Sequence, residues 1–366
     1  MATPVTTSRR AGSRSHGIRR GERTAGWLFS LPVIVILGVF LFIPVLMAIW
    51  VSFSDWNGRG SPLSTSVHFT GLTNYAAVAT DGGLAERNLG LALRNNAWYV
   101  VLVVPTQTAL SLMLAVLVNR AILRGRSFFR TAFYFPSVTS SVAITVLWLF
   151  LFSTTGVINK VLSWFGINGP NWFHDARGIV HVALGAVGVN SPPAALANHG
   201  LFGIDWWEWL SGPSFAMTAF ILMAIFTTSG TFMLLFIAAL QNISPEQAEA
   251  GALDGANGWQ QFWRITLPQL RPTMFTVVTL GLIGTWQVFD QIYTGTKGGP
   301  GKTTITPAYL SYQTAFEGQE WGQGSAIAFV LFLIIIAFTL LQRWALRERR
   351  LSKRRSFHHQ TRGKTS

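Results

Sequence analysis

Two clusters of polar residues stand inside long apolar segments, and of all residues in the sequence they are best suited to hold a solute. The first supplies hydroxyl groups from Thr227, Thr228 and Thr231. The second supplies amide and carboxylate groups from Gln287 and Asp290. Polar groups at membrane depth usually face protein or a water-filled path, and such groups beside an aromatic ring can bind a sugar. The hydroxyls could instead bond back to carbonyls of their own helix, and the sequence leaves that alternative open.

The sequence gives little support for thiol chemistry, metal binding or nucleotide binding. The chain has no cysteine, which excludes disulfides and a thiol nucleophile. Three histidines, His174, His181 and His199, are too scattered in one loop to predict a metal site. The run from Gly299 to Thr304 resembles a phosphate-binding loop, but Thr296 stands where that motif requires its first glycine. We therefore expect no metal, no cofactor, no ATP site and no enzymatic activity in this chain.

The elements that must position the polar clusters are membrane spans. The chain is 50% hydrophobic and 11% charged, against about 25% charged residues in soluble domains. Six apolar segments are long enough to cross roughly 30 Å of hydrocarbon. The predicted fold class is therefore all-α, a polytopic membrane protein with six transmembrane helices. The spans are expected at Trp27–Phe53, Ala97–Val118, Thr131–Phe152, Phe215–Leu240, Thr273–Tyr293 and Ser325–Leu341.

The distribution of Lys and Arg sets the expected orientation. The two tails, 1–24 and 342–366, and the loops after the second and fourth spans together carry 21 of the 28 basic residues. Cytoplasmic segments are enriched in Lys and Arg, so both termini are predicted to be cytoplasmic in a multi-pass protein of the cell membrane. The net charge of +14 is thereby explained by contact with the lipid bilayer, and no nucleic acid partner is needed. An organelle transit peptide at the Arg-rich N-terminus is the minor alternative.

The loop at 244–272 has the pattern of two short helices. Ser244 is expected to cap the first helix, with Gln247 completing a capping box. A face of very small residues follows, at Ala248, Gly251, Ala252 and Gly255. Gly255 is expected to end that helix in a left-handed conformation. Large apolar side chains in the second helix need some surface to cover them, which favours a docking element over a passive connector.

Three runs within this loop resemble a known family. Glu249-Ala250-Gly251, Asp254-Gly255-Ala256 and Ile265-Thr266-Leu267-Pro268 are similar to the EAA loop of permeases from binding-protein-dependent ABC importers. The sequence departs from the pattern at Gly251, where the family usually has Ala. The resemblance implies a coupling helix that docks on a cytoplasmic ATPase. The implied coupling residues are Glu249, Ala250, Gly251, Asp254, Gly255, Ala256, Ile265, Leu267 and Pro268.

Motifs elsewhere resemble the sugar branch of that family, which contains maltose and glycerol-phosphate permeases. They include Asp55–Gly58, Arg94–Asn96 and Gly298–Thr306, whereas a stretch at 167–205 falls outside the resemblance. The resemblance implies a MetI-like permease fold, with a first helix at 25–53, an external segment at 54–96 and a transmembrane core at 97–341. The implied substrate path, with Asp290 added from its polarity, is Ala224, Thr227, Thr228, Thr231, Ile283, Gly284, Gln287 and Asp290.

The resemblance also implies an assembly. The partners would be a second homologous permease subunit, two copies of a cytoplasmic ABC ATPase and an extracytoplasmic sugar-binding protein. The expected function is half of the translocation path for a sugar. Glycerol-phosphate or another polar solute is an alternative within transport. A membrane receptor or scaffold without transport is the alternative from a different class.

Overall fold

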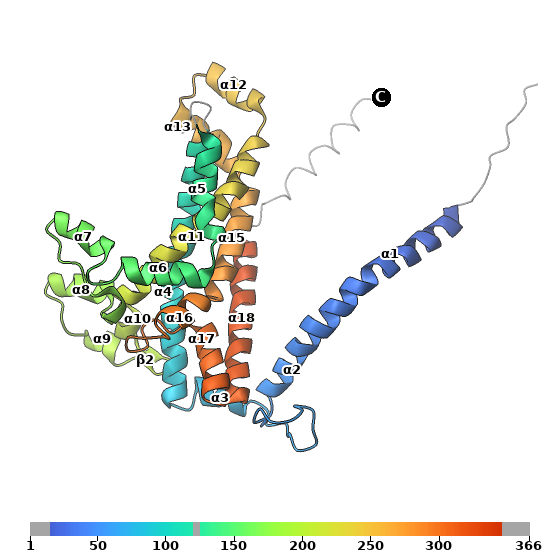
Figure 1. Cartoon of the computed structure of the whole chain (residues 1–366), viewed down its shortest axis with the longest axis vertical. Coiled ribbons are helices and arrows are strands. Elements are labelled where there is room, and N and C mark those ends of the chain that lie inside the picture. Colours follow the sequence, from blue (N-terminus) through green and yellow to red (C-terminus); the bar gives the residue numbers. More distant parts are fainter. Residues whose placement is uncertain (1–14, 120–124, 346–366) are drawn as a thin grey trace, which may run out of the picture.

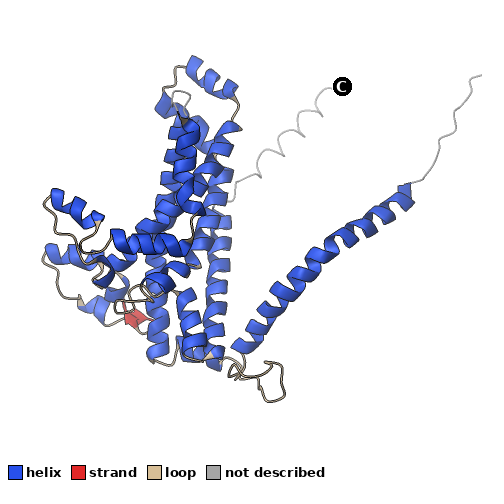
Figure 2. Ribbon diagram, viewed as in Figure 1, coloured by secondary structure: helices blue, strands red, loops and turns tan. Residues whose placement is uncertain are grey.

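The computed structural model describes residues 15–119 and 125–345, and its described part is dominated by helices (Figures 1 and 2). Within these residues, five helical segments are long and apolar enough to cross a membrane. Three are single helices, namely α4 (Leu84–Asn119), α11 (Phe215–Gln241) and α18 (Trp321–Ala345). The first segment joins α1 (Ser15–Leu37), η1 (Gly38–Phe42) and α2 (Ile43–Ser52). Another joins α15 (Arg271–Trp286) to α16 (Asp290–Gly295).

The third predicted span is not one continuous helix. It consists of α5 (Arg126–Val138) and α6 (Ser141–Leu151), bent by 98° at the break between them. Counting this pair as one span gives the six predicted from the sequence. The break follows from local chemistry, because Pro136 lacks a backbone N–H and Thr139 adopts an extended conformation. The hydroxyls of Ser137 and Thr139 donate to carbonyls of Tyr134 and Phe135, which compensates carbonyls near the break.

The centre of the bundle is α4, which packs against α11, α15 and α5 (Figure 1). Its fully buried residues include Ala92 and Val103, and those of α11 include Met217 and Phe220. α5 and α11 approach closely at Gly230, where a side chain would overlap the backbone carbonyl of Phe133. Close helix contacts at small residues are the usual way to pack spans without a hydrophobic driving force.

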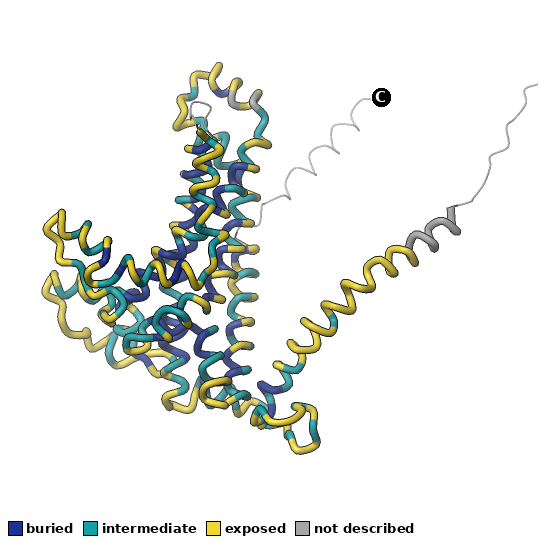
Figure 3. Tube along the Cα trace, in the orientation of Figure 1, coloured by how far each residue is buried: buried dark blue, intermediate teal, exposed yellow. Residues whose placement is uncertain are grey.

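The first span stands apart from the bundle over most of its length, and no residue from 24 to 50 is buried (Figure 3). Its last helix, α2, packs against α18, and the Ser52 hydroxyl at the end of α2 lies 2.7 Å from the Tyr75 hydroxyl. Tyr75 belongs to α3 (Thr73–Ala79), a short helix beside the start of α18. The exposed side chains of this span are almost all apolar, as expected of a helix that contacts lipid.

The segment between α6 and α11 forms a small unit beside the end of the bundle opposite the 244–272 loop (Figure 1). Its elements are α7 (Val157–Trp164), η2 (Trp172–His174), α8 (Ile179–Ala186), α9 (Ala194–Ala197), an antiparallel pair β1 (Gly200–Leu201) and β2 (Ile204–Asp205), and α10 (Trp206–Trp209). Glu208 holds this unit to α4 through ion pairs with Arg94 at 3.5 Å and Arg87 at 3.2 Å. The sequence had left the shape of this segment open.

The connection from α16 to α18 completes that end of the bundle. It contains α17 (Pro307–Tyr312) and the π-helical turn η4 (Gln313–Glu317). The glycine-rich run at 298–306 precedes α17, and its carbonyls at Lys302 and Ile305 accept from the Asn95 side chain of α4. This run follows a helix, not a strand, which agrees with rejecting it as a phosphate-binding loop.

Candidate functional site

The two polar clusters meet at one cavity of about 270 Å³ between α4, α11 and the α15–α16 segment. Predicted path residues on its wall are Ala224, Thr227 and Thr228 from α11, and Gly284, Gln287 and Asp290 from α15 and α16. Rings of Tyr99, Phe232 and Phe289 also line it. The wall therefore combines aromatic faces with hydroxyl, amide and carboxylate groups.

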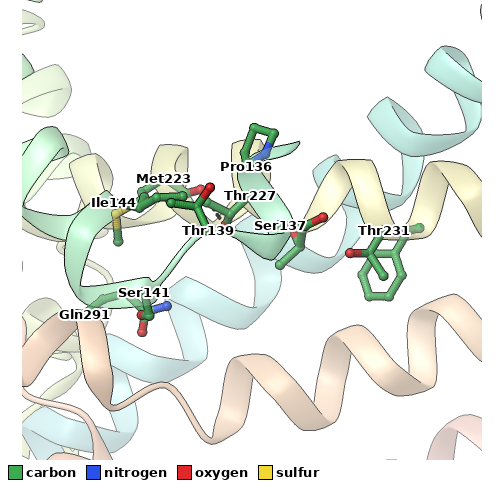
Figure 4. A pocket seen from close by; sticks show the side chains of 11 residues that line it. Pro136, Ser137, Thr139, Ser141, Ile144, Met223, Thr227, Thr231 and Gln291 are labelled. Atoms are coloured by element: carbon green, nitrogen blue, oxygen red, sulfur yellow. Dashed lines mark hydrogen bonds between the residues drawn. The ribbon is translucent and has the colours of Figure 1, made fainter. Parts of the chain in front are cut away.

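A second cavity of similar size adjoins the first, since Thr227 and Thr228 line both. Its wall includes residues on both sides of the α5–α6 break, among them Pro136, Thr139 and Ser141, together with Thr231 (Figure 4). The broken third span thus exposes its irregular backbone to a hollow, which is where membrane proteins tolerate non-helical backbone. Ile283 lies in the described part of the chain and lines neither cavity.

Thr227, Thr228 and Ser229 of α11 do bond back to carbonyls of their own helix, the alternative that the sequence left open. Thr227 donates to the Met223 carbonyl at 3.0 Å, and Ser229 contacts the Phe226 carbonyl at 3.2 Å. Thr228 differs because its Oγ1 also contacts the side-chain amide of Gln107, in α4, at 2.6 Å. Internal bonding and exposure to a cavity coexist here, since a hydroxyl oxygen keeps a second lone pair.

The helical break after Trp286 positions the amide of Gln287 and the carboxylate of Asp290 at the cavity wall. α15 ends at Trp286 and α16 begins at Asp290, which leaves Gln287 exposed. The Thr306 hydroxyl donates to the freed carbonyl of Val288 at 2.9 Å and holds the break in place. Trp286 itself is turned away and packs against Phe338 of α18, with ring centroids 5.4 Å apart. Phe289, which lines the cavity together with Gln287 and Asp290, supplies an aromatic face beside the polar cluster.

The loop at 244–272 folds as α12 (Pro245–Leu253), α13 (Gly258–Gln261), the π-helical turn η3 (Phe262–Thr266) and α14 (Leu267–Gln269). The predicted capping box at Ser244 is wrong, because its side chain makes no capping bond. Gln247 instead accepts from the Gln269 side chain at 2.6 Å, which ties the two halves of the loop together. A capping box does form further along, between Asn257 and Gln260.

The prediction that Gly255 ends the first helix in a left-handed conformation is confirmed. Its φ is +78°. The Gly255 N–H donates to the Ala252 carbonyl and the Ala256 N–H donates to the Gly251 carbonyl, at 3.0 and 2.9 Å. This pair of bonds is the Schellman motif, which favours glycine at this position.

The small-residue face of α12 divides between two surroundings. Gly251 is buried against the side chain of Ile265 within the loop, so it is unavailable to a partner. Gly255 and Ala252 are exposed, as are the acidic residues Glu249 and Asp254. Beside them, Leu253 is 90% and Trp259 is 71% exposed, a degree of apolar exposure that calls for a covering surface.

Comparison with known proteins shows the family to which this chain belongs. Residues 107–351 match the family described as "Binding-protein-dependent transport system inner membrane component". The chain belongs to this family. It is 30% identical to the lactose transport system permease protein LacF of Rhizobium radiobacter, over 94% of this chain and 100% of that protein. It is 28% identical to the arabinooligosaccharides transport system permease protein AraP of Halalkalibacterium halodurans, over 91% of each chain.

The fold agrees with this membership. A crystal structure of a bacterial ABC transporter involved in import of the acidic polysaccharide alginate superposes on this permease with a TM-score of 0.65, at 20% identity. The match covers 90% of this chain and 97% of that chain. The predicted fold class and the resemblance to ABC importer permeases are thereby confirmed, and the chain is a multi-pass membrane permease subunit.

Several residues at the permease cavity were absent from the predicted path. Tyr99, Phe289 and Gln291 line it, and Gln107 lies behind Thr228. A polar residue inside an apolar span is a usable signal, and it marks Gln107 in the sequence. Among the described residues, no group of three metal-ligating side chains comes together. His181 stacks on Trp207 at 4.3 Å instead.

Proposed function

We propose that this permease forms one half of the transmembrane path of an ATP-driven sugar importer. Its proposed partners are a second homologous permease subunit, two copies of a cytoplasmic ABC ATPase and an extracytoplasmic sugar-binding protein. The cavity where Thr228, Gln287 and Phe289 meet carries the proposal, because these side chains offer the stacking and hydrogen bonds that a sugar requires. Relatives named as lactose and arabinooligosaccharide permeases support it. A related solved transporter in complex with an oligosaccharide-bound periplasmic protein supports the binding-protein partner.

The chemistry of the wall favours a neutral sugar over glycerol-phosphate. The residues lining the two cavities include one carboxylate, Asp290, and no Lys or Arg. Phosphate recognition relies on Arg or Lys, whose charge-assisted bonds are about twice as strong as neutral ones. A dianionic solute would meet only negative charge and neutral dipoles on this half of the path. The alternative of an anionic solute is therefore less well supported than a neutral one.

The loop at 244–272 is proposed to couple ATP binding to movement of the cavity wall. It connects the end of α11 to the start of α15, and these two helices carry Thr228 and Gln287 to the cavity. In the proposed mechanism the ATPases close on binding ATP and the docked loop follows them. The cavity then opens toward the side from which sugar arrives. We propose that the partner subunit hydrolyses ATP. We also propose that both termini of this chain lie in the cytoplasm.

Reconstitution tests this proposal. The complete complex, assembled with a candidate ATPase, second permease and binding protein, is placed in liposomes. ATP-dependent uptake is then measured for radiolabelled lactose, maltotriose, arabinobiose and glycerol 3-phosphate. We expect uptake of a neutral oligosaccharide and none of glycerol 3-phosphate. Preferential uptake of glycerol 3-phosphate would replace the sugar assignment, and a stable complex that moves none of these solutes would favour the scaffold alternative.

A further inference from the structure

The side chain of Gln107 is fully buried in the middle of α4, where α4, α11 and α15 meet. One end of its amide contacts Thr228 Oγ1 at 2.6 Å. The other end lies against Gly281 of α15, and a side chain at position 281 would overlap the Gln107 Nε2 atom. Gly281 and Thr228 both line the main cavity. Gln107 therefore stands directly behind two residues of the cavity wall.

The hydrogen bonds around Thr228 fix which way the amide points. As placed, Thr228 Oγ1 has two acceptors, Gln107 Oε1 and the Ala224 carbonyl, each at 2.6 Å. One hydroxyl proton cannot serve both. Gln107 Nε2 meanwhile is buried with no hydrogen-bond partner, which costs free energy. Exchanging the amide oxygen and nitrogen, a choice that the bonding network must decide, lets Gln107 donate to Thr228 and Thr228 donate to Ala224.

This arrangement gives the Thr228 hydroxyl defined donor and acceptor roles. Its oxygen donates its proton to the Ala224 carbonyl and accepts from Gln107. One of its two lone pairs therefore stays free. Because Thr228 lines both cavities, that lone pair is available to a solute. It can accept a hydrogen bond from a sugar hydroxyl, which carries a proton to donate.

We propose that Gln107 is a positioning residue of the solute path, which fixes the Thr228 hydroxyl as a hydrogen-bond acceptor for a hydroxyl group of the transported sugar. The inference rests on the proposed function for the identity of the solute, whereas the bond from Gln107 to Thr228 is independent of it. Gly281 supplies the space that the amide occupies.

The test compares Gln107→Met, Thr228→Val and the double variant in the complete importer in liposomes. Saturating sugar-loaded binding protein is supplied, using a sugar that the wild-type complex transports, and sugar moved per ATP hydrolysed is measured. We expect each single variant to lower this ratio about fivefold, as loss of one buried hydrogen bond allows. Stimulated hydrolysis should stay within about twofold of wild type. The double variant should be no worse than the poorer single variant, because both remove the same bond.

Matched variants separate positioning from general packing. Gln342 in α18 is also buried and donates to Thr279 Oγ1 at 3.0 Å, and neither residue lines either of the two cavities described above. Gln342→Met should keep the wild-type ratio of sugar to ATP. Thr228→Ser keeps the hydroxyl and should keep the ratio as well. An unchanged ratio in Gln107→Met, a parallel fall of transport and hydrolysis, or single effects that multiply in the double variant would overturn the proposal.

A measurement without sugar keeps failure of this inference distinct from failure of the proposed function. Thermal unfolding of the purified complexes is compared for the same two single variants and the double variant. The shifts in midpoint should be clearly less than additive, since the two side chains are in contact. Additive shifts would overturn the bond from Gln107 to Thr228, even if the wild-type complex transported none of the sugars tried.

Discussion

A methyl group added to Gly251 would lie 2.7 Å from the Cδ1 atom of Ile265. The two halves of the 244–272 loop therefore touch at Gly251, the position at which this sequence departs from the EAA pattern. Ile265 is half-buried, and its terminal methyl group occupies the space that an alanine side chain would take. The departure from the family pattern is thus matched by the packing of a residue 14 positions further along the chain.

Gly251→Ala should test this packing. Ala improves helix propensity by about 1 kcal/mol, but overpacking costs roughly 1–3 kcal/mol. We expect the net effect to be a mild loss of ATPase stimulation in the assembled complex. Shortening the partner in Gly251→Ala/Ile265→Val should restore it. Equal stimulation in wild type and Gly251→Ala would show that Ile265 moves aside at no functional cost.

Gly255→Val should uncouple transport from hydrolysis while the chain still inserts in the membrane. The left-handed φ of +78° is strained for a β-branched residue, by roughly 1–2 kcal/mol. Co-purification of the ATPase and sugar-stimulated hydrolysis measure the outcome. Normal association together with normal stimulation would remove Gly255 from the coupling surface.

Gly255→Asn serves as the control, because Asn tolerates the left-handed region. No atom beyond the neighbouring residues lies within 4 Å of a Cβ at this position, so any steric conflict must come from a partner. If only backbone strain matters, Asn should behave nearly as wild type. If Asn uncouples as strongly as Val, the ATPase contacts this position directly.

Gln287→Leu should lower sugar uptake by about fivefold or more without impairing assembly. Its exposed amide lies on the cavity wall, and loss of one hydrogen bond to a solute is worth about 1 kcal/mol or more. Uptake and recovery of the intact complex are measured in parallel. Gln323→Leu, in the first turn of α18, where the amide donates to Glu320 and lines neither cavity, should leave uptake unchanged. Unaltered uptake in Gln287→Leu would exclude this residue from the path.

The proposed topology can be tested because the natural chain has no cysteine. Ser13→Cys and Ser356→Cys should resist an impermeant thiol reagent in intact cells. Both positions lie outside the described residues. Ser191→Cys, in the exposed segment between α9 and α8, should react readily if that segment is external. Labelling at Ser13 or Ser356 with protection at Ser191 would invert the orientation.

The sequence alone determined the class of fold, and its resemblance to the EAA pattern located the loop that is proposed to couple. Apolar runs of about 20 residues predict spans because hydrocarbon offers no partner for backbone polar groups. That constraint is local, so it located α4, α11 and α18 directly. The left-handed end of α12 at Gly255 was equally predictable, since few residues other than glycine adopt that conformation.

Only the tertiary structure decided how the polar residues are shared between packing and cavity. Thr131–Phe152 reads as one apolar span, yet it breaks at Thr139, where a neighbouring hollow accommodates irregular backbone. The expected cap partner of Ser244, Gln247, bonds Gln269 instead. Trp286 turns toward Phe338, whereas Phe289 faces the cavity. Gln107 reaches Thr228 across 121 positions of sequence. These outcomes depend on which helices meet, and residue spacing within one helix carries no information about its neighbours.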